Sequence, residues 1–342
     1  MFRVLLALFL VLTLEAKPLT SLISNMIIIG FEGEKVPPNL QSYIKENGLG
    51  AVILFSKNIK NPQQLIALTT ALKACDDTLM IATDQEGGLV QRLREKNGYF
   101  DTPKAVEMPK LGEKEAKLRY TNMAEILSQS GINVNFAPSV DLAKNPKNKV
   151  IAKYGRAFSA DPKVVIKYAN IFIKAMEKEG VLCVIKHFPG HGSSLEDSHK
   201  GFVDVSETWS REELEPFFAL KSKAVMSAHI FNRHLDDTYP ATLSQKTNAL
   251  LRQSGFDGVL ISDDLQMKAI SNNFDLNTTI TKAINADIDM LLFGNQLSKP
   301  LKIDKLVEMI EALVKRGDIK LSRIEEANVR INRIKKGLNA RR

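Results

Sequence analysis

Cysteine is scarce in this sequence, with only 2 among 342 residues. Two cysteines cannot make a disulfide framework, and they cannot make a structural zinc site on their own. Cys183 lies in an apolar stretch, where a buried thiol acts as a small hydrophobic group, and Cys75 ends a helical pattern. We therefore expect two free thiols.

The motifs of two common enzyme classes are also missing. No Gly-x-Gly-x-x-Gly follows the first apolar stretch, which disfavours a dinucleotide-binding open sheet. No Gly-x-Ser-x-Gly elbow is present, which disfavours a serine hydrolase even though Ser193, Ser194 and Ser198 lie near histidines. The chain has no linker rich in Pro, Gly or Ser and no internal repeat, so we expect a single domain.

Basic residues outnumber acidic ones, 47 to 39, which gives a net charge of +8. Part of the excess lies in residues 330–342, which contain basic residues and no acidic residue. Aromatic residues are not interleaved with this charge, so we expect no nucleic-acid partner. The stretch is typical of a solvated helix end, and attraction to an anionic envelope polymer or lipid surface is the alternative.

The N-terminus has the pattern of a secretory signal. Arg3 supplies a positive charge, the stretch from Val4 to Leu14 is apolar, and Ala16 offers a small residue for cleavage. The apolar stretch is too short to span a bilayer as a helix. We expect residues 1–16 to be a signal peptide, with an uncleaved anchor as the alternative, and residues 17–342 to form a periplasmic or secreted domain.

Short apolar runs recur along the rest of the chain and show little alternation. Strands that are buried on both faces have this pattern, as parallel strands do. The runs are Met26–Phe31, Ala51–Phe55, Leu79–Asp84, Val134–Val140, Val181–Ile185, Ala224–Ile230, Gly258–Ser262 and Met290–Phe293.

Helical patterns lie between most of these runs, at residues 61–73, 161–180, 210–221, 243–253 and 277–286. Asn61-Pro62 and Asp161-Pro162 each supply an N-cap followed by proline at the first helical position. Strands that alternate with helices over this length predict an α/β fold of the (β/α)8 TIM-barrel type. A doubly wound open sheet is the second candidate.

Polar residues occur where the apolar runs end. In a (β/α)8 barrel the C-terminal ends of the strands form the active site, so we expect these residues to converge there. They are Asp84, Asp141, Lys186, His187, His229 and Asp263. Asp263 stands out because a carboxylate at the end of an apolar strand is costly to bury unless it is paired or used. Alternatively, Asp263 or Asp264 caps a helix that begins near Leu265.

The segment from His187 to His199 holds three of the five histidines. His187 and His191 have the spacing of metal ligands, but Pro189 and Gly190 lie between them, so a shared helical face is not expected. Asp197 and His199 are two residues apart, and in an extended loop both can point the same way. This spacing favours an acid/base histidine that is oriented by an aspartate, although Asp197 could instead form a turn.

These residues resemble the motifs of bacterial β-N-acetylglucosaminidases (β-N-acetylhexosaminidases) of glycoside hydrolase family 3, single-domain enzymes that act on peptidoglycan fragments. The similar segments follow the family's order between about residues 26 and 300. They are Asp84–Gly88 with Val90–Arg92, Gly155–Phe158, Lys186–Gly192, Asp197–His199 and Gly258–Asp264.

The resemblance implies roles for eight of the matched residues. Asp263 would be the nucleophile that forms a covalent glycosyl-enzyme, and His199, oriented by Asp197, would be the acid/base. The sugar would be bound by Asp84, Arg92, Arg156, Lys186 and His187. No metal and no cofactor is implied, and we expect a monomer.

The chain departs from the family pattern in two respects. Leu89 occupies a position where a basic residue is common, and the secretory segment contrasts with many cytoplasmic relatives. We therefore expect a retaining exo-β-N-acetylglucosaminidase that acts on GlcNAc-containing peptidoglycan fragments outside the cytoplasm. Two alternatives are a GlcNAc phosphorylase that uses the same site and a non-catalytic glycan-binding barrel of the cell envelope.

Overall fold

The computed structural model describes residues 18–340, and the predicted signal peptide at residues 1–16 lies outside them. The fold is α/β, as the sequence predicts, and the named strands pair only in parallel within the described residues. The strands are β1 (Ile27–Gly30), β2 (Ala51–Leu54), β3 (Met80–Thr83), β4 (Val134–Asn135), β5 (Leu182–Cys183), β6 (Ile185–Phe188), β7 (Ala224–Ser227), β8 (Val259–Ser262) and β9 (Leu291–Phe293).

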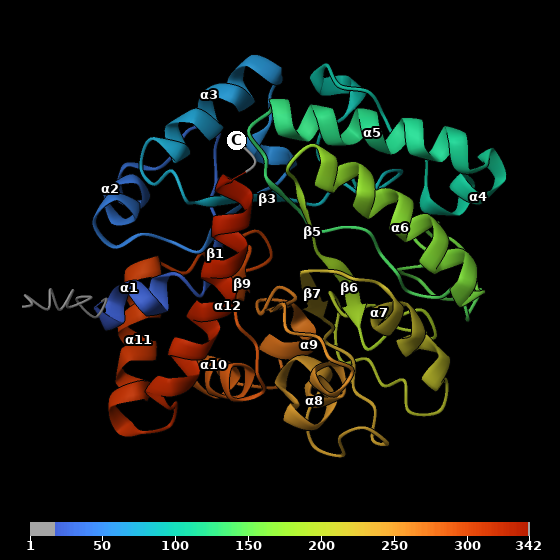
Figure 1. The fold of residues 1–342 in the computed structure, drawn as a ribbon. Coiled ribbons are helices and arrows are strands. Elements are labelled where there is room, and N and C mark those ends of the chain that lie inside the picture. The colour runs from blue at the N-terminus through green and yellow to red at the C-terminus, as the bar shows by residue number, and fades with distance from the viewer. Residues whose placement is uncertain (1–17, 341–342) are drawn as a thin grey trace, which may run out of the picture.

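The helices lie around the strands, which occupy the middle of the molecule (Figure 1). The α-helices are α1 (Leu19–Ser24), α2 (Pro38–Asn47), α3 (Pro62–Lys73), α4 (Met108–Leu111), α5 (Glu113–Gln129), α6 (Pro162–Lys178), α7 (Glu215–Ala219), α8 (Gln245–Gln253), α9 (Lys268–Ser271), α10 (Leu276–Asn285), α11 (Ile303–Arg316) and α12 (Leu321–Asn339). Short 3-10 helices are η1 (Ser56–Asn58), η2 (Glu95–Asn97), η3 (Ala105–Glu107), η4 (Arg211–Leu214) and η5 (Ala241–Leu243).

The strands form two sheets, with the orders β5-β4-β3-β2-β1-β9 and β6-β7-β8. Isolated parallel bridges join Ile261 of β8 to Met290, next to β9, and Ser139 to Lys186 of β6. Every residue in these strands is buried, which explains why the strands have apolar runs without alternation. All strands therefore point their C-terminal ends toward one side of the sheets.

Side-chain caps fix the starts of several helices. Asn61 accepts a hydrogen bond from the Gln64 amide at the start of α3, and Asp161 accepts one from the Lys163 amide at the start of α6. In both helices proline follows the cap, where its missing N–H costs nothing. These two predicted helix starts are confirmed. None of the helices between residues 18 and 340 is long and apolar enough to cross a bilayer.

The predicted strands Val134–Val140 and Ala224–Ile230 are shorter in the structure, where only β4 and β7 are strands. Two further predicted elements are divided. The run Val181–Ile185 was expected to be one strand that ends before Lys186, but it divides into β5 and β6, and Lys186 and His187 lie inside β6. The division arises because β5 pairs with β4, whereas β6 pairs with β7. The helix expected at residues 210–221 is instead η4 followed by α7, and Pro216, which lacks an N–H donor, sits at the junction.

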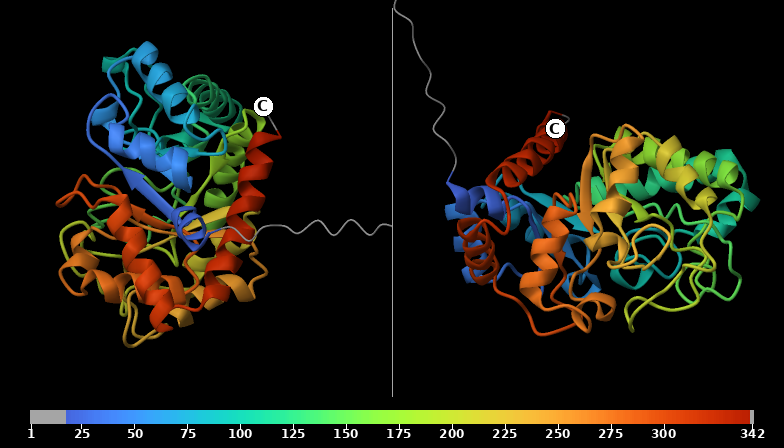
Figure 2. Two further views of the ribbon diagram at one scale, coloured as in Figure 1. Left: turned by 90° about the vertical axis from the view of Figure 1, so that its left-hand side faces the viewer. Right: turned by 90° about the horizontal axis from the view of Figure 1, so that it is seen from below.

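The first and last helices lie side by side, because α1 packs against both α11 and α12 (Figure 2). The basic residues of α12 are only partly the solvated helix end that the sequence predicts. Arg330 makes ion pairs with Asp287 and Asp289, and the buried Lys335 donates a hydrogen bond to the Leu49 carbonyl at 2.7 Å. Cys75 and Cys183 are free thiols, as expected.

Candidate functional site

A cavity of about 400 Å³ lies at the C-terminal ends of the strands, where the sequence predicted the site. Seven of the eight predicted site residues line it, and the eighth, Asp197, contacts the lining residue His199. The seven are Asp84, Arg92, Arg156, Lys186, His187, His199 and Asp263. The structure therefore brings together residues from widely separated parts of the chain.

Asp84, directly after β3, joins two of the predicted sugar-binding cations. Its Oδ1 lies 2.9 Å from Lys186 Nζ, and its Oδ2 lies 2.9 Å from Arg92 Nη2. Burial alone would raise the pKa of Asp84, but Lys186 and Arg92 outweigh burial and hold the pKa well below its ordinary value. Asp84 is therefore a fixed carboxylate acceptor at the wall of the cavity.

Glu86 belongs to this network, although sequence reasoning assigned it no role. Its carboxylate accepts two hydrogen bonds from Arg156, at 2.7 and 2.9 Å, and Lys186 Nζ lies 2.8 Å away. Burial opposes ionisation, yet Arg156 and Lys186 lower the pKa of Glu86 to about 2. Glu86 thus orients the side chains of both Arg156 and Lys186. Its position two residues after Asp84 was the available signal.

Asp141 is the second residue that sequence reasoning left without a role. Its Oδ2 accepts from His187 Nδ1 at 2.6 Å, and its Oδ1 accepts from the amides of His187 and His191 at 3.2 and 2.7 Å. Because the Asp141 carboxylate accepts a hydrogen bond from Nδ1–H, it sets the tautomer of His187 and leaves Nε2 directed toward Arg156, 3.3 Å away. The end of the fourth apolar run was the signal for this residue.

Asp263 follows β8, and its amide donates to the Ser227 carbonyl at the end of β7, at 3.0 Å. Its carboxylate forms no ion pair with Lys or Arg among the described residues. Burial would raise its pKa, but the imidazoles of His229, His187 and His199 keep the pKa below its ordinary value. Asp263 is therefore an ionised group that faces histidines, which leaves the carboxylate available to a substrate.

Asp264 does not cap a helix that begins near Leu265, as the alternative interpretation of this pair proposed. The next helix is α9, which starts at Lys268 without a side-chain cap. Asp264 Oδ1 instead accepts from the amides of Gln266 and Gly294, at 3.0 and 3.2 Å. Burial raises the pKa of Asp264 to about 6. The two adjacent aspartates thus have opposite pKa shifts.

His199 and Asp197 are paired, but through a turn rather than an extended loop. Asp197 Oδ1 accepts from His199 Nδ1 at 2.9 Å and from the His199 amide at 3.0 Å. The same carboxylate therefore forms the turn and orients the imidazole, so the two interpretations of Asp197 do not exclude each other. The His199 side chain is 50% exposed at the mouth of the cavity, where it can reach a substrate and water.

The buried imidazoles beside this pair are engaged in hydrogen bonds. His191 Nδ1 lies 2.7 Å from Ser194 Oγ, and its Nε2 lies 3.3 Å from Ser198 Oγ. His229 contacts the Thr242 hydroxyl and the Asp264 carbonyl, both at 2.9 Å. Within residues 18–340 no group of three or more His, Cys, Asp or Glu side chains is arranged to hold a metal ion.

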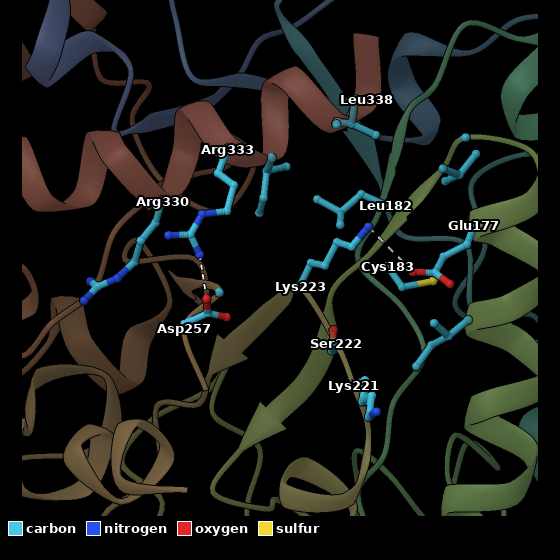
Figure 3. Close-up of a pocket in the computed structure, with 16 residues that line it drawn as sticks. Glu177, Leu182, Cys183, Lys221, Ser222, Lys223, Asp257, Arg330, Arg333 and Leu338 are labelled. Carbon is cyan, nitrogen blue, oxygen red and sulfur yellow. Dashed lines mark hydrogen bonds and ion pairs between the residues drawn. The ribbon is translucent and has the colours of Figure 1, made fainter. Parts of the chain in front are cut away.

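A second cavity, of about 310 Å³, lies at the opposite, N-terminal ends of β5, β7 and β8 (Figure 3). Four of its charged groups form two ion pairs with each other. Arg333 of α12 pairs with Asp257 at 2.6 Å, and Lys223 points toward Glu177 at 3.9 Å. This cavity has no carboxylate–imidazole pair among its described lining residues, so the arrangement suited to acid/base chemistry belongs to the first cavity.

Comparisons with known proteins agree with this geometry. Residues 19–334 match the model of the glycosyl hydrolase family 3 N terminal domain. The chain is 36% identical over 286 residues to beta-hexosaminidase A of Pseudoalteromonas piscicida, with 75% of this chain and 48% of that protein covered. It therefore spans about half the length of that relative. It is 33% identical over 282 residues to a beta-hexosaminidase of Xylella fastidiosa, with 78% of this chain and 82% of the relative covered.

Solved structures of similar proteins superpose on this chain. A family 3 beta-N-acetylglucosaminidase from Paenibacillus sp. superposes with a TM-score of 0.86 at 30% identity, covering 95% of this chain and 63% of that one. Beta-N-acetylhexosaminidase from Beutenbergia cavernae gives a TM-score of 0.85 at 26% identity, covering 93% of this chain and 98% of that one. The fold described above is therefore found in proteins of this kind at nearly the full length of this chain.

Proposed function

Because the chain belongs to glycoside hydrolase family 3, we propose that it is a retaining exo-β-N-acetylglucosaminidase. The observation that carries this proposal is the cavity that places Asp263 and the Asp197–His199 pair at one site. Relatives named beta-hexosaminidase or beta-N-acetylglucosaminidase support the choice of sugar.

In the first step, one carboxylate oxygen of Asp263 attacks the anomeric carbon of a terminal GlcNAc, and the bond from this carbon to the leaving oxygen breaks. The protonated imidazole of His199 gives its proton to that oxygen, so the aglycone leaves as an alcohol. The lowered pKa of Asp263 supports this role, because a nucleophile must be ionised. The product of this step is a covalent glycosyl-enzyme.

In the second step, His199, now neutral, takes a proton from water, and the hydroxide oxygen bonds to the anomeric carbon as the bond to Asp263 breaks. Two displacements return the β-configuration. Retaining enzymes ordinarily use a second carboxyl group for this proton transfer. A histidine suits the same task because the unperturbed pKa of an imidazole lies near neutrality, and Asp197 fixes the orientation of the His199 ring.

The remaining predicted residues would hold the sugar. Asp84 can accept hydrogen bonds from sugar hydroxyls, while Arg92, Arg156 and Lys186 can donate to oxygens of the substrate. Glu86 and Asp141 would not touch the sugar; they fix the orientation of Lys186, Arg156 and His187. Such prior orientation reduces the reorganisation that a reaction needs in its transition state.

We also propose that the two sheets close into a (β/α)8 barrel formed by a single domain of residues 17–342. The parallel bridges Ile261–Met290 and Ser139–Lys186 support closure, because they lie at the two places where the sheets would meet. In such a barrel the catalytic groups come from the C-terminal ends of several strands. The positions of Asp84, Asp141 and Asp263 agree with this arrangement.

For the natural substrate, we propose GlcNAc-containing peptidoglycan fragments met outside the cytoplasm. The secretory pattern of residues 1–16 supports the location, and the net charge of +8 suits fragments that carry carboxylates. Incubation of the purified protein with defined muropeptides tests this proposal. Release of free GlcNAc supports it, and cleavage of chitin disaccharides with muropeptides left intact contradicts it.

The activity itself is tested by release of a chromogenic leaving group from β-GlcNAc and β-glucose, with and without phosphate. We expect fast release from β-GlcNAc that does not depend on phosphate, and no turnover by an Asp263→Ala variant that still folds. Release only with phosphate, together with a sugar 1-phosphate product, would make the protein a phosphorylase. The histidine acid/base keeps that alternative chemically open, because it repels an anion less than a carboxylate does.

A further inference from the structure

Glu213 is a buried carboxyl group that the proposed mechanism does not use. It lies on η4, its side chain is 1% exposed, and it does not line the cavity. Its Oε2 accepts a hydrogen bond from the Gly192 amide at 3.1 Å. It therefore reaches the glycine-rich loop, Pro189–Ser194, from outside the site.

The surroundings of Glu213 suit a neutral acid rather than a carboxylate. Its Oε1 has no hydrogen-bond partner among the described residues, and neither has the buried Ser193 hydroxyl oxygen. Ser193 still lies close enough for its hydroxyl to lower the pKa of the Glu213 carboxyl, as the backbones of Gly192 and Ser210 also do, but burial outweighs all three. A proton on Oε1 would give Ser193 Oγ a donor, and one proton would satisfy both atoms.

The charges around Glu213 also favour a neutral acid over a carboxylate. The charge that raises the pKa of Glu213 is the carboxylate of Asp141, which bonds to the loop at the His191 amide and is paired with His187. Lys144, which could offset a negative charge, is paired with the neighbouring Glu212. Burial, with a smaller contribution from Asp141, raises the pKa of Glu213 to about 7. A second buried anion at this place would be unpaired and therefore costly.

Glu213 packs closely against the loop. Gly190 has a φ of +119°, and a Cβ atom built there would lie 2.6 Å from Glu213 Cβ. Trp209, four residues before Glu213, donates its indole N–H to the Pro189 carbonyl at 3.1 Å. The segment 209–213 thus holds the loop at its beginning through Trp209 and in its middle through Glu213.

The loop leads to the proposed acid/base pair. The His191 amide bonds to Asp141, and the His191 ring contacts Ser194 and Ser198. Ser198 lies between Asp197 and His199 in the turn that orients the His199 imidazole. A shift of Gly192 and Ser193 would therefore be passed through His191 to the position of His199.

We propose that Glu213 is a positioning residue for the glycine-rich loop. As a neutral acid it holds the loop in place, and its ionisation loosens the loop. Proton binding outside the cavity would thereby regulate the site. The regulatory part of this proposal rests on the proposed glycosidase function. The proposal does not make Glu213 a catalytic residue, because it touches neither the cavity nor the reacting groups.

The test compares kcat/KM of the wild type and Glu213→Gln between pH 5.5 and 9 with a chromogenic β-GlcNAc substrate. Glutamine reproduces the neutral acid, because its oxygen can accept from Gly192 and its NH₂ can donate to Ser193. For a group that titrates at about 7, we expect the wild type to lose about tenfold more activity between pH 6 and 8 than the variant does. The matched control is Glu212→Gln, adjacent but paired with Lys144, whose profile should follow the wild type.

A second measurement needs neither turnover nor a variant. Hydrogen exchange of residues 187–199 in the wild type, corrected for intrinsic rates, should become faster at pH 8 than at pH 6. Superimposable pH profiles of the wild type and Glu213→Gln would overturn the proposal, and so would loop exchange that does not change with pH. If the wild type releases no sugar at all, the proposed function fails, and the exchange result still decides whether Glu213 controls the loop.

Discussion

His199 is the only histidine of the candidate site whose side chain is largely exposed, and this exposure separates its proposed role from those of His187, His191 and His229. Those three are buried and hold fixed hydrogen bonds. A group that must first protonate a leaving oxygen and later activate water needs access to both. His199, held by Asp197 on one side and open on the other, has that access.

Replacing His199 with alanine should therefore affect substrates according to their leaving groups. We expect hydrolysis of a GlcNAc disaccharide to slow by about 10²–10⁴-fold, because its leaving oxygen needs a proton. An aryl glycoside with a good leaving group should form the glycosyl-enzyme almost normally, and added azide should speed its breakdown to a β-glycosyl azide. Initial rates and product analysis check both points.

The control for this experiment is His234→Ala, because His234 is exposed and does not line the cavity. Its rates should equal those of the wild type. An equal loss on both substrates for His199→Ala, with no effect of azide, would argue that His199 binds the sugar rather than transferring a proton.

At the scale of elements, one buried carboxylate joins three parts of the fold. Asp289 is 0% exposed, and its oxygens accept from Arg252 of α8, from the Leu260 amide of β8, and from Arg323 and Arg330 of α12. Arg323 and Arg330 also pair with Asp287. Part of the basic charge of α12 therefore attaches the last helix to the strands.

The substitution Asp289→Asn should consequently destabilise the fold. Removing one member of a buried ion-pair network leaves the others uncompensated, and we expect a loss of about 3–5 kcal/mol in the free energy of unfolding. Urea denaturation measures this loss. Asp257→Asn is the control, because Asp257 is 86% exposed in its pair with Arg333, so the change should be about 0–1 kcal/mol. Equal effects of the two substitutions would contradict this account.

The strands were the most predictable elements. Burial on both faces leaves an uninterrupted apolar run, and this signal does not depend on partners far along the chain. The division of the run at Val184 does depend on distant strands, because β5 pairs with β4 and β6 pairs with β7. The local sequence around Val184 does not encode this change of pairing partner. For the same reason Lys186 and His187 were expected in a loop and lie in a strand.

The residues of the candidate site were predictable where a polar or charged side chain stands at the end of an apolar run. Asp84, His187 and Asp263 break apolar runs, and the cavity contains all three. Glu86 was missed, and Asp141 was expected at the site but given no role. Both carboxylates orient other side chains, and a sequence does not state which groups a carboxylate will contact. Glu213 lies far from any motif and became visible only through its burial.

At the scale of the whole molecule, buried carboxyl groups should give stability an optimum in pH. Glu86, with its pKa lowered to about 2, contributes stability above the ordinary carboxyl pKa, and this contribution is lost as the pH falls toward 2. Asp264 and Glu213, with pKa values raised to about 6 and about 7, contribute stability at low pH that is lost as the pH rises through those values.

Thermal unfolding between pH 3 and 8 checks this balance. We expect the highest Tm near the ordinary carboxyl pKa, at about pH 4–5, with a fall on both sides. The Glu213→Gln variant should lose less stability on the alkaline side, and Glu86→Gln should lose less on the acid side. A Tm that rises steadily from pH 6 to 8 would contradict the raised pKa values of Asp264 and Glu213.

The central claim is that Asp263 forms a covalent bond to GlcNAc. Its most direct test uses a fluorinated GlcNAc analogue with a good leaving group, which forms the glycosyl-enzyme faster than it breaks down. Mass spectrometry of the intact protein and of its peptides then locates the sugar. The account predicts one sugar per chain, on the peptide that contains Asp263. A sugar attached to a different residue, or turnover of the ordinary substrate by Asp263→Ala at the wild-type rate, would contradict it.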